Sequence, residues 1–326
     1  MTQSPILQVR RLRKYYDITR GLFSRVVGHV HAVEDVSFEV GRQEVLGVAG
    51  ESGSGKTTIG RSVLGLVQPT AGEVVFDGKN VLEFDKAAML RFRRSAQIIF
   101  QDPYASINPT MTVGQAIAEP LRVQKIASGS DLADRVAQLL ADVSLPVDFA
   151  RRRPSDLSGG QRQRVVIARA LAVEPRFVVA DEPVSALDVS IQAQIINLLE
   201  ELKERRSLAM LFISHDLAVL EYLSDRIAVV YLGRLMEIGP SRQVIASPRH
   251  PYTEALISAV PDPTGTRKRI ILQGDAPSAV APPSGCVFRT RCRYALPACA
   301  DEVPTLREVE PGHWKACYRD DVPTNS

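Results

Sequence analysis

The residues best suited to bind phosphate lie between positions 50 and 57. They spell GESGSGKT, which fits the spacing G-x-x-x-x-G-K-[ST]. Glycines let backbone N–H groups curl around phosphate oxygens, and a helix that starts there adds a favourable partial charge. Lys56 would reach the β- and γ-phosphates of a nucleotide, and the Thr57 hydroxyl would hold Mg²⁺. The predicted nucleotide-binding residues are Gly50, Ser52, Gly53, Ser54, Gly55, Lys56, Thr57 and Thr58.

Two adjacent carboxylates follow an apolar run further along the chain. The stretch FVVADEP places Asp181 and Glu182 at the end of a predicted strand. Asp181 is positioned to hold Mg²⁺ through water, and Glu182 could polarise an attacking water as a general base. Such carboxylates also serve as helix caps or lie in solvent. A phosphate loop earlier in the chain favours the catalytic interpretation, which predicts hydrolysis of a nucleoside triphosphate.

A second glycine turn, LSGGQ, opens the amphipathic segment 157–171. It offers another hydroxyl and another set of free N–H groups to an anion, although one ATP needs only one phosphate loop. The motif resembles the signature sequence of ATP-binding cassette (ABC) ATPases, in which two cassettes sandwich ATP and each signature faces the other's phosphate loop. The resemblance implies that these residues serve the ATP of a partner cassette: Ser158, Gly159, Gly160 and Gln161.

The remaining ABC motifs occur in the expected order. Gln101, in IIFQDP, resembles the Q-loop glutamine, which contacts Mg²⁺ and the attacking water and senses the transmembrane partner. Asp188, in SALD, resembles the D-loop residue at the dimer interface, and His215, in FISHD, matches the switch histidine at the γ-phosphate. Tyr16, in RLRKYY, aligns with the aromatic residue that stacks on adenine, although Tyr15 could take that role. The resemblance therefore implies catalytic roles for Glu182, His215 and Gln101, and Mg²⁺ binding through Thr57, Gln101 and Asp181.

The elements that position these residues follow from hydrophobic periodicity. The apolar runs EVLGVAG, FVVADEP and AMLFISHD predict buried parallel strands whose carboxyl ends line one edge. The segment 191–206 carries the apolar stripe of an intervening helix. These patterns predict a doubly wound α/β core. The ABC resemblance implies a P-loop NTPase cassette with a mostly parallel sheet, an antiparallel β subdomain and an α-helical subdomain.

Composition along the chain indicates its division into parts. We expect a nucleotide-binding domain over residues 1–240, in which about 97–169 form the helical subdomain. The segment 17–30 has no clean period, so we expect a loop inserted between strands. Twelve of the 21 prolines and all four cysteines fall in the last 87 residues. Residues 241–326 are therefore predicted to form a small, loop-rich C-terminal module.

Bulk properties restrict the class of protein. The 326 residues are 45% hydrophobic and 24% charged, as in folded globular chains, and the net charge of +3 predicts no nucleic-acid partner. No run approaches the roughly 18 apolar residues of a membrane-spanning helix. The first residues lack an apolar core followed by a cleavage site, so we expect no export. The expected reducing, cytoplasmic location weighs against structural disulfides.

The cysteines have the spacing C-x5-C-x6-C-x17-C, which is neither the C-x2-C pairing of typical zinc sites nor a ferredoxin run. From the residues alone an iron–sulfur cluster, a zinc ion and free thiols all remain open. The pattern resembles a [4Fe–4S]-binding motif in the tails of peptide-permease ATPases, which implies a structural or regulatory cluster. Nearby Arg289, Arg291 and Arg293 could neutralise its charge or lie in solvent. The implied ligands are Cys286, Cys292, Cys299 and Cys317.

The segment SPRHPYTEALISAVP, residues 247–261, together with the cysteine region resembles the C-terminal region of ATPase subunits from bacterial oligopeptide and dipeptide permeases. The stretch 17–38 resembles the F-type member of their paired ATPases. The resemblance implies ATP- and Mg²⁺-dependent peptide uptake with a D-type ATPase as heterodimer partner, two transmembrane permeases and an extracytoplasmic peptide-binding protein. It places the chain on the cytoplasmic face of the inner membrane, with 101–121 as the candidate permease-docking segment. The alternatives are an importer of nickel, glutathione or another small solute, or an ATP-binding redox-sensing regulator.

Overall fold

A computed structural model describes residues 4–21, 24–260 and 269–320. The chain forms two compact units: one contains Met1–Ile6, Val40–Glu44 and Glu83–Ile213, and the other contains Leu7–Glu39, Val45–Leu82 and Ser214–Ser326. Four parts of the expectations above lie outside the described residues. They are residues 1–3 of the stretch considered for export, Leu22 and Phe23 of the expected loop, and residues 261–268 and 321–326 of the expected C-terminal module, of which Pro261 also ends the permease-like segment.

The first unit contains three parallel strands, β6 (Ala96–Ile99), β7 (Phe177–Asp181) and β8 (Ala209–Ile213), with β7 in the middle. Every residue of β7 and β8 is buried. Burial on both faces explains why these strands are continuous apolar runs and do not alternate. The prediction of buried parallel strands is confirmed.

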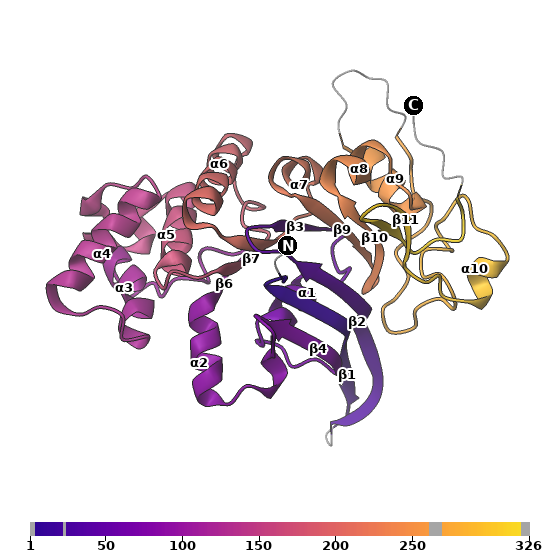
Figure 1. Cartoon of the computed structure of the whole chain (residues 1–326), viewed down its shortest axis with the longest axis horizontal. Coiled ribbons are helices and arrows are strands. Elements are labelled where there is room, and N and C mark those ends of the chain that lie inside the picture. The colour runs from indigo at the N-terminus through magenta and orange to yellow at the C-terminus, as the bar shows by residue number, and fades with distance from the viewer. Residues whose placement is uncertain (1–3, 22–23, 261–268, 321–326) are drawn as a thin grey trace. The chain divides into compact units, whose positions relative to one another are not determined.

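Helices make up the rest of the first unit, and α3, α4 and α5 form one group in Figure 1. Helix α6 buries Ile195, Leu198 and Leu202, members of the predicted apolar stripe. The predicted helical segments are therefore present. The helices are α2 (Lys86–Ser95), α3 (Val113–Val123), α4 (Gly129–Asp142), α5 (Gly159–Leu171) and α6 (Val189–Arg206), with 3-10 turns at Val147–Arg151 and Pro154–Asp156.

The second unit has a four-stranded sheet in the order β2-β1-β4-β5. The strands are β1 (Leu7–Arg20), β2 (Arg25–Val40), β4 (Ala71–Phe76) and β5 (Lys79–Asn80). The expectation of a loop over 17–30 is wrong, because β1 continues to Arg20 and β2 begins at Arg25. Val26 and Val27 are 47% and 57% exposed, so no buried face imposes an alternating pattern there, while β-branched residues still favour extended backbone.

A second set of strands in this unit begins with β3 (Val45–Ala49), which runs parallel to β9 (Arg226–Tyr231). Strand β9 pairs antiparallel with β10 (Arg234–Pro240). The helices of the unit are α1 (Lys56–Val63), α7 (Leu217–Leu223), α8 (Ser241–Ala246), α9 (Pro251–Ser258) and α10 (Ala298–Asp301), and a 3-10 turn covers Val81–Glu83.

The C-terminal module contributes strands as well as loops. Strand β12 (His313–Lys315) pairs antiparallel with β10, and β11 (Arg307–Glu310) pairs with β12. The module also packs an aromatic cluster: the rings of Tyr252 and Phe288 lie 5.2 Å apart, and Tyr231 of β9 lies 4.6 Å and 5.3 Å from them. All three rings are buried, so this proline-rich region shares an apolar core with β9.

A buried polar group fixes β12 on β10. Glu237 of β10 is fully buried and accepts hydrogen bonds from the backbone N–H groups of Arg249 (2.7 Å) and His250 (2.9 Å). Its carboxylate also lies 2.7 Å from Nε2 of His313, the first residue of β12. Because a buried carboxylate needs several partners, this group specifies one way of docking the module's strands on β10.

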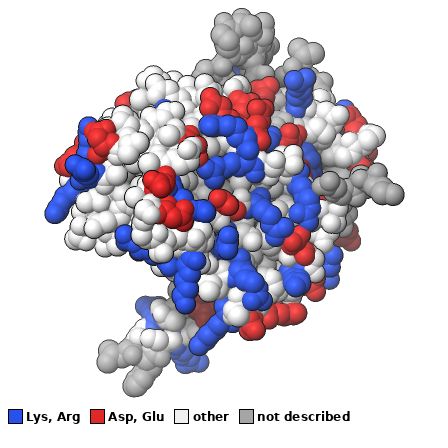
Figure 2. All heavy atoms as spheres, turned by 60° about the vertical axis from the view of Figure 1, so that its left-hand side comes forward, with Lys and Arg blue, Asp and Glu red and all other residues white. Residues whose placement is uncertain are grey.

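Acidic and basic side chains lie interspersed on the face shown in Figure 2.

Among the helices that the structure describes, none is both long and apolar enough to cross a membrane.

Candidate functional site

The phosphate loop lies in the second unit, between β3 and α1, with Gly55 capping the helix at φ 102°. A Cβ on Gly55 would collide with the carbonyl oxygen of Ala32, and one on Gly50 would collide with that of Val230. The loop therefore runs against the backbone of β2 and β9, where only glycine fits. Helix α1 begins at Lys56, as the motif predicts.

Lys56 is only 4% exposed, and its Nζ donates hydrogen bonds to the carbonyls of Gly50 (2.8 Å) and Glu51 (2.9 Å). The N–H of Ser54 donates to the same Glu51 carbonyl at 3.2 Å, and the carbonyl of Ser54 accepts from the N–H of Gly233 at 2.8 Å. Ser52 and Gly53 are exposed at the crown of the loop. The ammonium is thus held against a curled backbone whose crown is open to solvent, an arrangement suited to binding phosphate.

The two neighbouring tyrosines of β1 differ in their contacts. The Tyr15 hydroxyl donates to Glu34 at 2.5 Å, and its ring lies 4.4 Å from that of His31. Tyr16 is 39% exposed, and its ring is approached only by Lys14, whose Nζ lies 4.9 Å from the centroid, among the contacts described. A ring that is to stack on a base needs a free face, so Tyr16 suits that role better than Tyr15.

The predicted catalytic residues of the first unit meet at the end of β7. Asp181, the last residue of the strand, is 2% exposed. Glu182 follows with φ 47°, a conformation uncommon for residues other than glycine. Gln101, which follows β6, donates a hydrogen bond from Nε2 to Glu182 Oε2 at 2.9 Å. The structure therefore brings together the glutamine and the carboxylate that were predicted separately from two motifs.

The signature residues form the N-terminus of α5. Ser158 caps the helix in a reciprocal capping box: its Oγ accepts from the N–H of Gln161 at 3.3 Å, and Gln161 Oε1 accepts from the N–H of Ser158 at 3.1 Å. Ser158 is exposed, whereas Gly160 is buried against Ile191 of α6. Asp188 is the residue before the first turn of α6. The signature thus presents a capped helix terminus to solvent.

One residue of this region escaped the sequence analysis. Arg162, on α5, donates to the carbonyls of Pro154 (2.7 Å) and Leu157 (3.2 Å), and its guanidinium lies 3.6 Å from the ring centroid of Tyr104. Tyr104 follows Gln101 by three residues, so Arg162 connects the Q-loop with the turn before the signature. Nothing in the spacing of these residues indicates such a contact.

His215 lies in the second unit and is exposed. It immediately precedes Asp216, which caps α7 by accepting from the N–H of Ala218 at 2.9 Å.

The predicted site residues are divided between the two units. The phosphate loop, Tyr16 and His215 belong to the second unit, whereas the Q-loop, signature and D-loop residues and both carboxylates belong to the first.

All four cysteines line one small cavity of the C-terminal module, together with His250 and Tyr294. Burial raises the pKa of Cys286 and Cys292 to about 11, and the neighbouring thiols add to the effect when charged. Within the described ranges, no three His, Cys, Asp or Glu side chains are close enough to form a ready site for a metal ion. The four cysteines thus surround one cavity, and their role as ligands of a metal or cluster stays a prediction.

The neighbouring arginines have partners in other elements of the unit. Arg291 contacts Glu51 of the phosphate loop at 2.9 Å, and Arg293 contacts Glu254 of α9 at 2.8 Å. Arg289 donates to the carbonyl of Ser284 at 2.9 Å. Arg291 and Arg293 therefore pair with carboxylates, and Arg293 is also exposed. The expectation that these arginines neutralise a cluster or lie in solvent stays a prediction.

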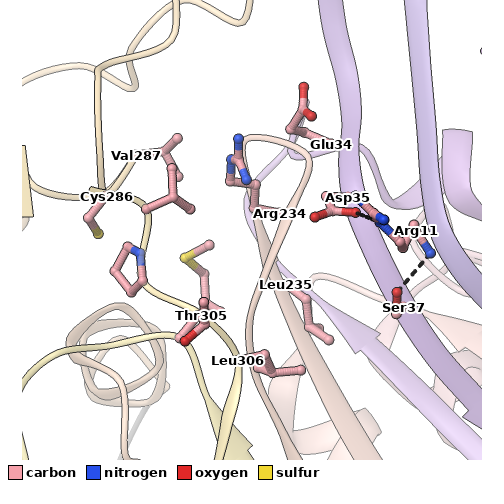
Figure 3. Close-up of a pocket in the computed structure, with 14 residues that line it drawn as sticks. Arg11, Glu34, Asp35, Ser37, Arg234, Leu235, Cys286, Val287, Thr305 and Leu306 are labelled. Atoms are coloured by element: carbon pink, nitrogen blue, oxygen red, sulfur yellow. Dashed lines mark hydrogen bonds and ion pairs between the residues drawn. The ribbon is translucent and has the colours of Figure 1, made fainter. Parts of the chain in front are cut away.

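Another pocket of the second unit, shown in Figure 3, has Cys286 and Val287 on one wall and β1 and β2 on the other. The side chain of Arg11 donates to Asp35 at 3.4 Å, and the backbone N–H of Arg11 donates to the hydroxyl of Ser37 at 2.8 Å. Arg11 and Asp35, the charged pair joined by a dashed line in Figure 3, already bind each other. They therefore do not indicate a ligand.

The cassette fold is shared with solved structures. The ATP-binding cassette MJ0796, in a dimeric post-hydrolysis state bound to ADP and phosphate, is 29% identical with a TM-score of 0.64, and the alignment covers 72% of this chain and 99% of that one. CbiO1 of Clostridium perfringens, part of an ABC transporter complex, is 26% identical with a TM-score of 0.64 over 75% of this chain and 92% of its own. The fold is therefore the α/β fold of a P-loop NTPase cassette, as predicted.

Two family models match the chain. That of the ABC transporter covers residues 33–185, and that of the oligopeptide/dipeptide transporter C-terminal region covers 236–299. A Brucella ovis protein, provisionally named a peptide import ATP-binding protein, is 55% identical over 99% of this chain and 100% of its own length. The oligopeptide transport ATP-binding protein AppF of Bacillus subtilis is 46% identical over 97% and 98%. The chain belongs to the ABC transporter ATP-binding proteins of the oligopeptide/dipeptide importer family, and it is an ATPase of that family.

Proposed function

We propose that this chain is the ATP-hydrolysing subunit that powers peptide uptake through a multi-subunit ABC importer. The observation that carries the proposal is similarity along the whole chain to relatives named for peptide import, including the oligopeptide/dipeptide transporter region over 236–299. The cassette motifs are common to ABC proteins of many kinds. The C-terminal module is what directs the proposal to peptides.

In the proposed reaction Glu182 accepts a proton from the attacking water, and the hydrogen bond from Gln101 orients its carboxylate. Lys56 binds the β- and γ-phosphates, and His215 contacts the γ-phosphate. Mg²⁺, held through Thr57, Gln101 and Asp181, would offset phosphate charge, and these hydroxyl, amide and carboxylate oxygens are of the kind that Mg²⁺ prefers. Tyr16 stacks on adenine through its open ring face.

We further propose that the chain is the F-type subunit and pairs with a D-type ATPase. Ser158 to Gln161 would then bind the partner's ATP, and Asp188 would lie at the dimer interface. The exposed, capped start of α5 supports this role, because its backbone N–H groups favour an anion. The pair would act on two permeases and an extracytoplasmic peptide-binding protein, from the cytoplasmic face of the inner membrane.

A [4Fe–4S] cluster in the C-terminal module is a separate proposal. The convergence of four thiols on one cavity supports it. A zinc ion needs every sulfur about 2.3 Å from one point, whereas a cluster has one iron for each thiolate and spaces its ligands more widely. Anaerobically purified protein should be brown and contain iron and acid-labile sulfide, and a colourless protein with stoichiometric zinc would contradict the cluster.

Reconstitution in proteoliposomes tests the transport function. The chain would be combined with the proposed D-type ATPase, two permeases and a peptide-binding protein. Peptide on the binding-protein side should raise phosphate release and accumulate inside, and neither should occur with Glu182→Gln. Stimulation by nickel or glutathione but not by peptide would favour the related importers. Activity that ignores every solute and responds to oxidation of the module would favour a regulator.

A further inference from the structure

An ion pair joins the phosphate loop to the cysteine-bearing turn. Nη1 of Arg291 donates to both carboxylate oxygens of Glu51, at 2.9 and 3.1 Å. Glu51 is the second residue of GESGSGKT, and Arg291 directly precedes Cys292. The Arg291 side chain is 10% exposed and that of Glu51 is 30% exposed. The pair is therefore largely shielded from water, which strengthens its interaction.

The backbone of Glu51 is held from the same side. Its N–H donates to the hydroxyl of Tyr252 at 2.9 Å, and Tyr252 belongs to the buried aromatic cluster of the C-terminal module. Its carbonyl accepts from Lys56 Nζ at 2.9 Å. The module thus fixes both the side chain and the N–H of the residue whose carbonyl holds the phosphate-binding ammonium.

Charge gives this contact a consequence for nucleotide binding. A carboxylate in a loop that binds a polyphosphate repels the ligand unless a cation offsets it. Among the contacts of the described residues, Arg291 is the cation that bonds the carboxylate of Glu51. Without Arg291, Glu51 would keep its negative charge beside the triphosphate and would lose the contact that fixes its position.

Local hydrogen bonds place Arg291 where it meets Glu51. The N–H of Arg291 donates to the carbonyl of Phe288 at 3.0 Å, and the N–H of Cys286 donates to the carbonyl of Cys299 at 2.8 Å. Arg291 Nη1 also lies 3.4 Å from the Tyr231 hydroxyl. The turn that carries two of the cysteines therefore fixes the position of the guanidinium.

We infer that Arg291 is a positioning residue for nucleotide binding: acting through Glu51, it raises the affinity of the phosphate loop for ATP, and the C-terminal module thereby contributes to the nucleotide site. Arg291 itself touches no phosphate in this assignment. Its effect depends on its charge and on its contact with Glu51.

Calorimetric titration of the full chain with Mg-ATP tests the assignment. Arg291→Gln should weaken ATP binding about tenfold, equivalent to roughly 1.4 kcal/mol. Combining it with Glu51→Gln, which removes the unpaired carboxylate, should restore most of the affinity. Arg291→Lys should stay within about threefold of the parent, because only one guanidinium nitrogen reaches Glu51 and a point charge can replace it. Arg293→Gln is the matched control, since it removes the same charge two residues away.

The assignment is separated from a loss of folding by the melting temperatures of all variants, because Glu51→Gln removes an uncompensated charge and would restore stability as well. Equal ATP affinity in Arg291→Gln and the parent would overturn it. So would equal weakening by Arg293→Gln, or a double variant as weak as Arg291→Gln. If Arg291→Gln does not fold, the assignment is tested by the ATP affinities of Arg291→Lys and the double variant. Both should stay close to the affinity of the parent, and a large loss in either would overturn the assignment.

Discussion

Gln101 and Glu182, 81 residues apart in the sequence, are joined by a hydrogen bond of 2.9 Å from Nε2 to Oε2. One residue follows β6 and the other follows β7, and these strands are parallel neighbours. A displacement of the Q-loop therefore changes the orientation of the carboxylate proposed as the general base.

Glu182→Gln should lower phosphate release about 100-fold or more, the lower range for loss of a general base. ATP binding should persist and a closed dimer should accumulate, because the amide keeps the shape of the side chain. Phosphate release and size-exclusion chromatography with ATP measure the two effects. Glu201→Gln, on the exposed face of α6, serves as the control. Near-parent turnover of Glu182→Gln would remove Glu182 from the catalytic role.

Gln101→Glu would place a second carboxylate in hydrogen-bonding range of Glu182. The two like charges would repel each other, which favours protonation of one of the two carboxyl groups. A base must be deprotonated to act, and the acid limb of the pH–rate profile should therefore move to higher pH. Gln101→Ala should lower the rate without moving that limb. Identical acid limbs in Gln101→Glu and the parent would show that the 2.9 Å contact is lost in the working state.

Tyr16→Ala should weaken ATP binding by the value of one aromatic–base stack, about 1–3 kcal/mol. Tyr15→Phe, which removes only the hydroxyl bonded to Glu34, should leave ATP affinity close to that of the parent. Titration of both variants with a fluorescent ATP analogue compares them. A larger loss in Tyr15→Phe than in Tyr16→Ala would exchange the roles of the two tyrosines.

His250 should make the protein less stable in mild acid. Complete burial, assisted by the charge of Lys315, lowers the pKa of His250 to about 3 from its ordinary value of 6.5. Below about pH 6.5 the unfolded chain takes up a proton that the folded protein excludes. The free energy of unfolding should thus fall by roughly 1.4 kcal/mol per pH unit from this residue until the pH nears its folded pKa.

Melting temperatures at pH 7 and pH 5 check this prediction. His250→Asn keeps an acceptor for the helix cap at Tyr252 and should lose less stability between the two pH values than the parent. His29→Asn changes an exposed histidine and should behave like the parent. An equal acid loss in His250→Asn and the parent would contradict the assigned effect.

The predictions that succeeded depend on local pattern. Apolar runs identified β7 and β8, and the glycine spacing placed the start of α1 at Lys56. The continuation of β1 and β2 was missed because a solvent-exposed ribbon lacks the alternation that reveals a strand. The Glu51–Arg291 and Tyr104–Arg162 contacts were missed because tertiary packing alone brings these residues together.

The pairing of β10 with β12 also bears on how the protein is made. During synthesis β10 leaves the ribosome well before residues 313–315, so its outer edge stays without a partner while the cysteine region is translated. An unpaired strand edge invites association with other nascent chains. Chains that end prematurely before β12 should therefore retain an unpaired strand edge, and cells producing them would depend on chaperones or proteases to keep them from accumulating.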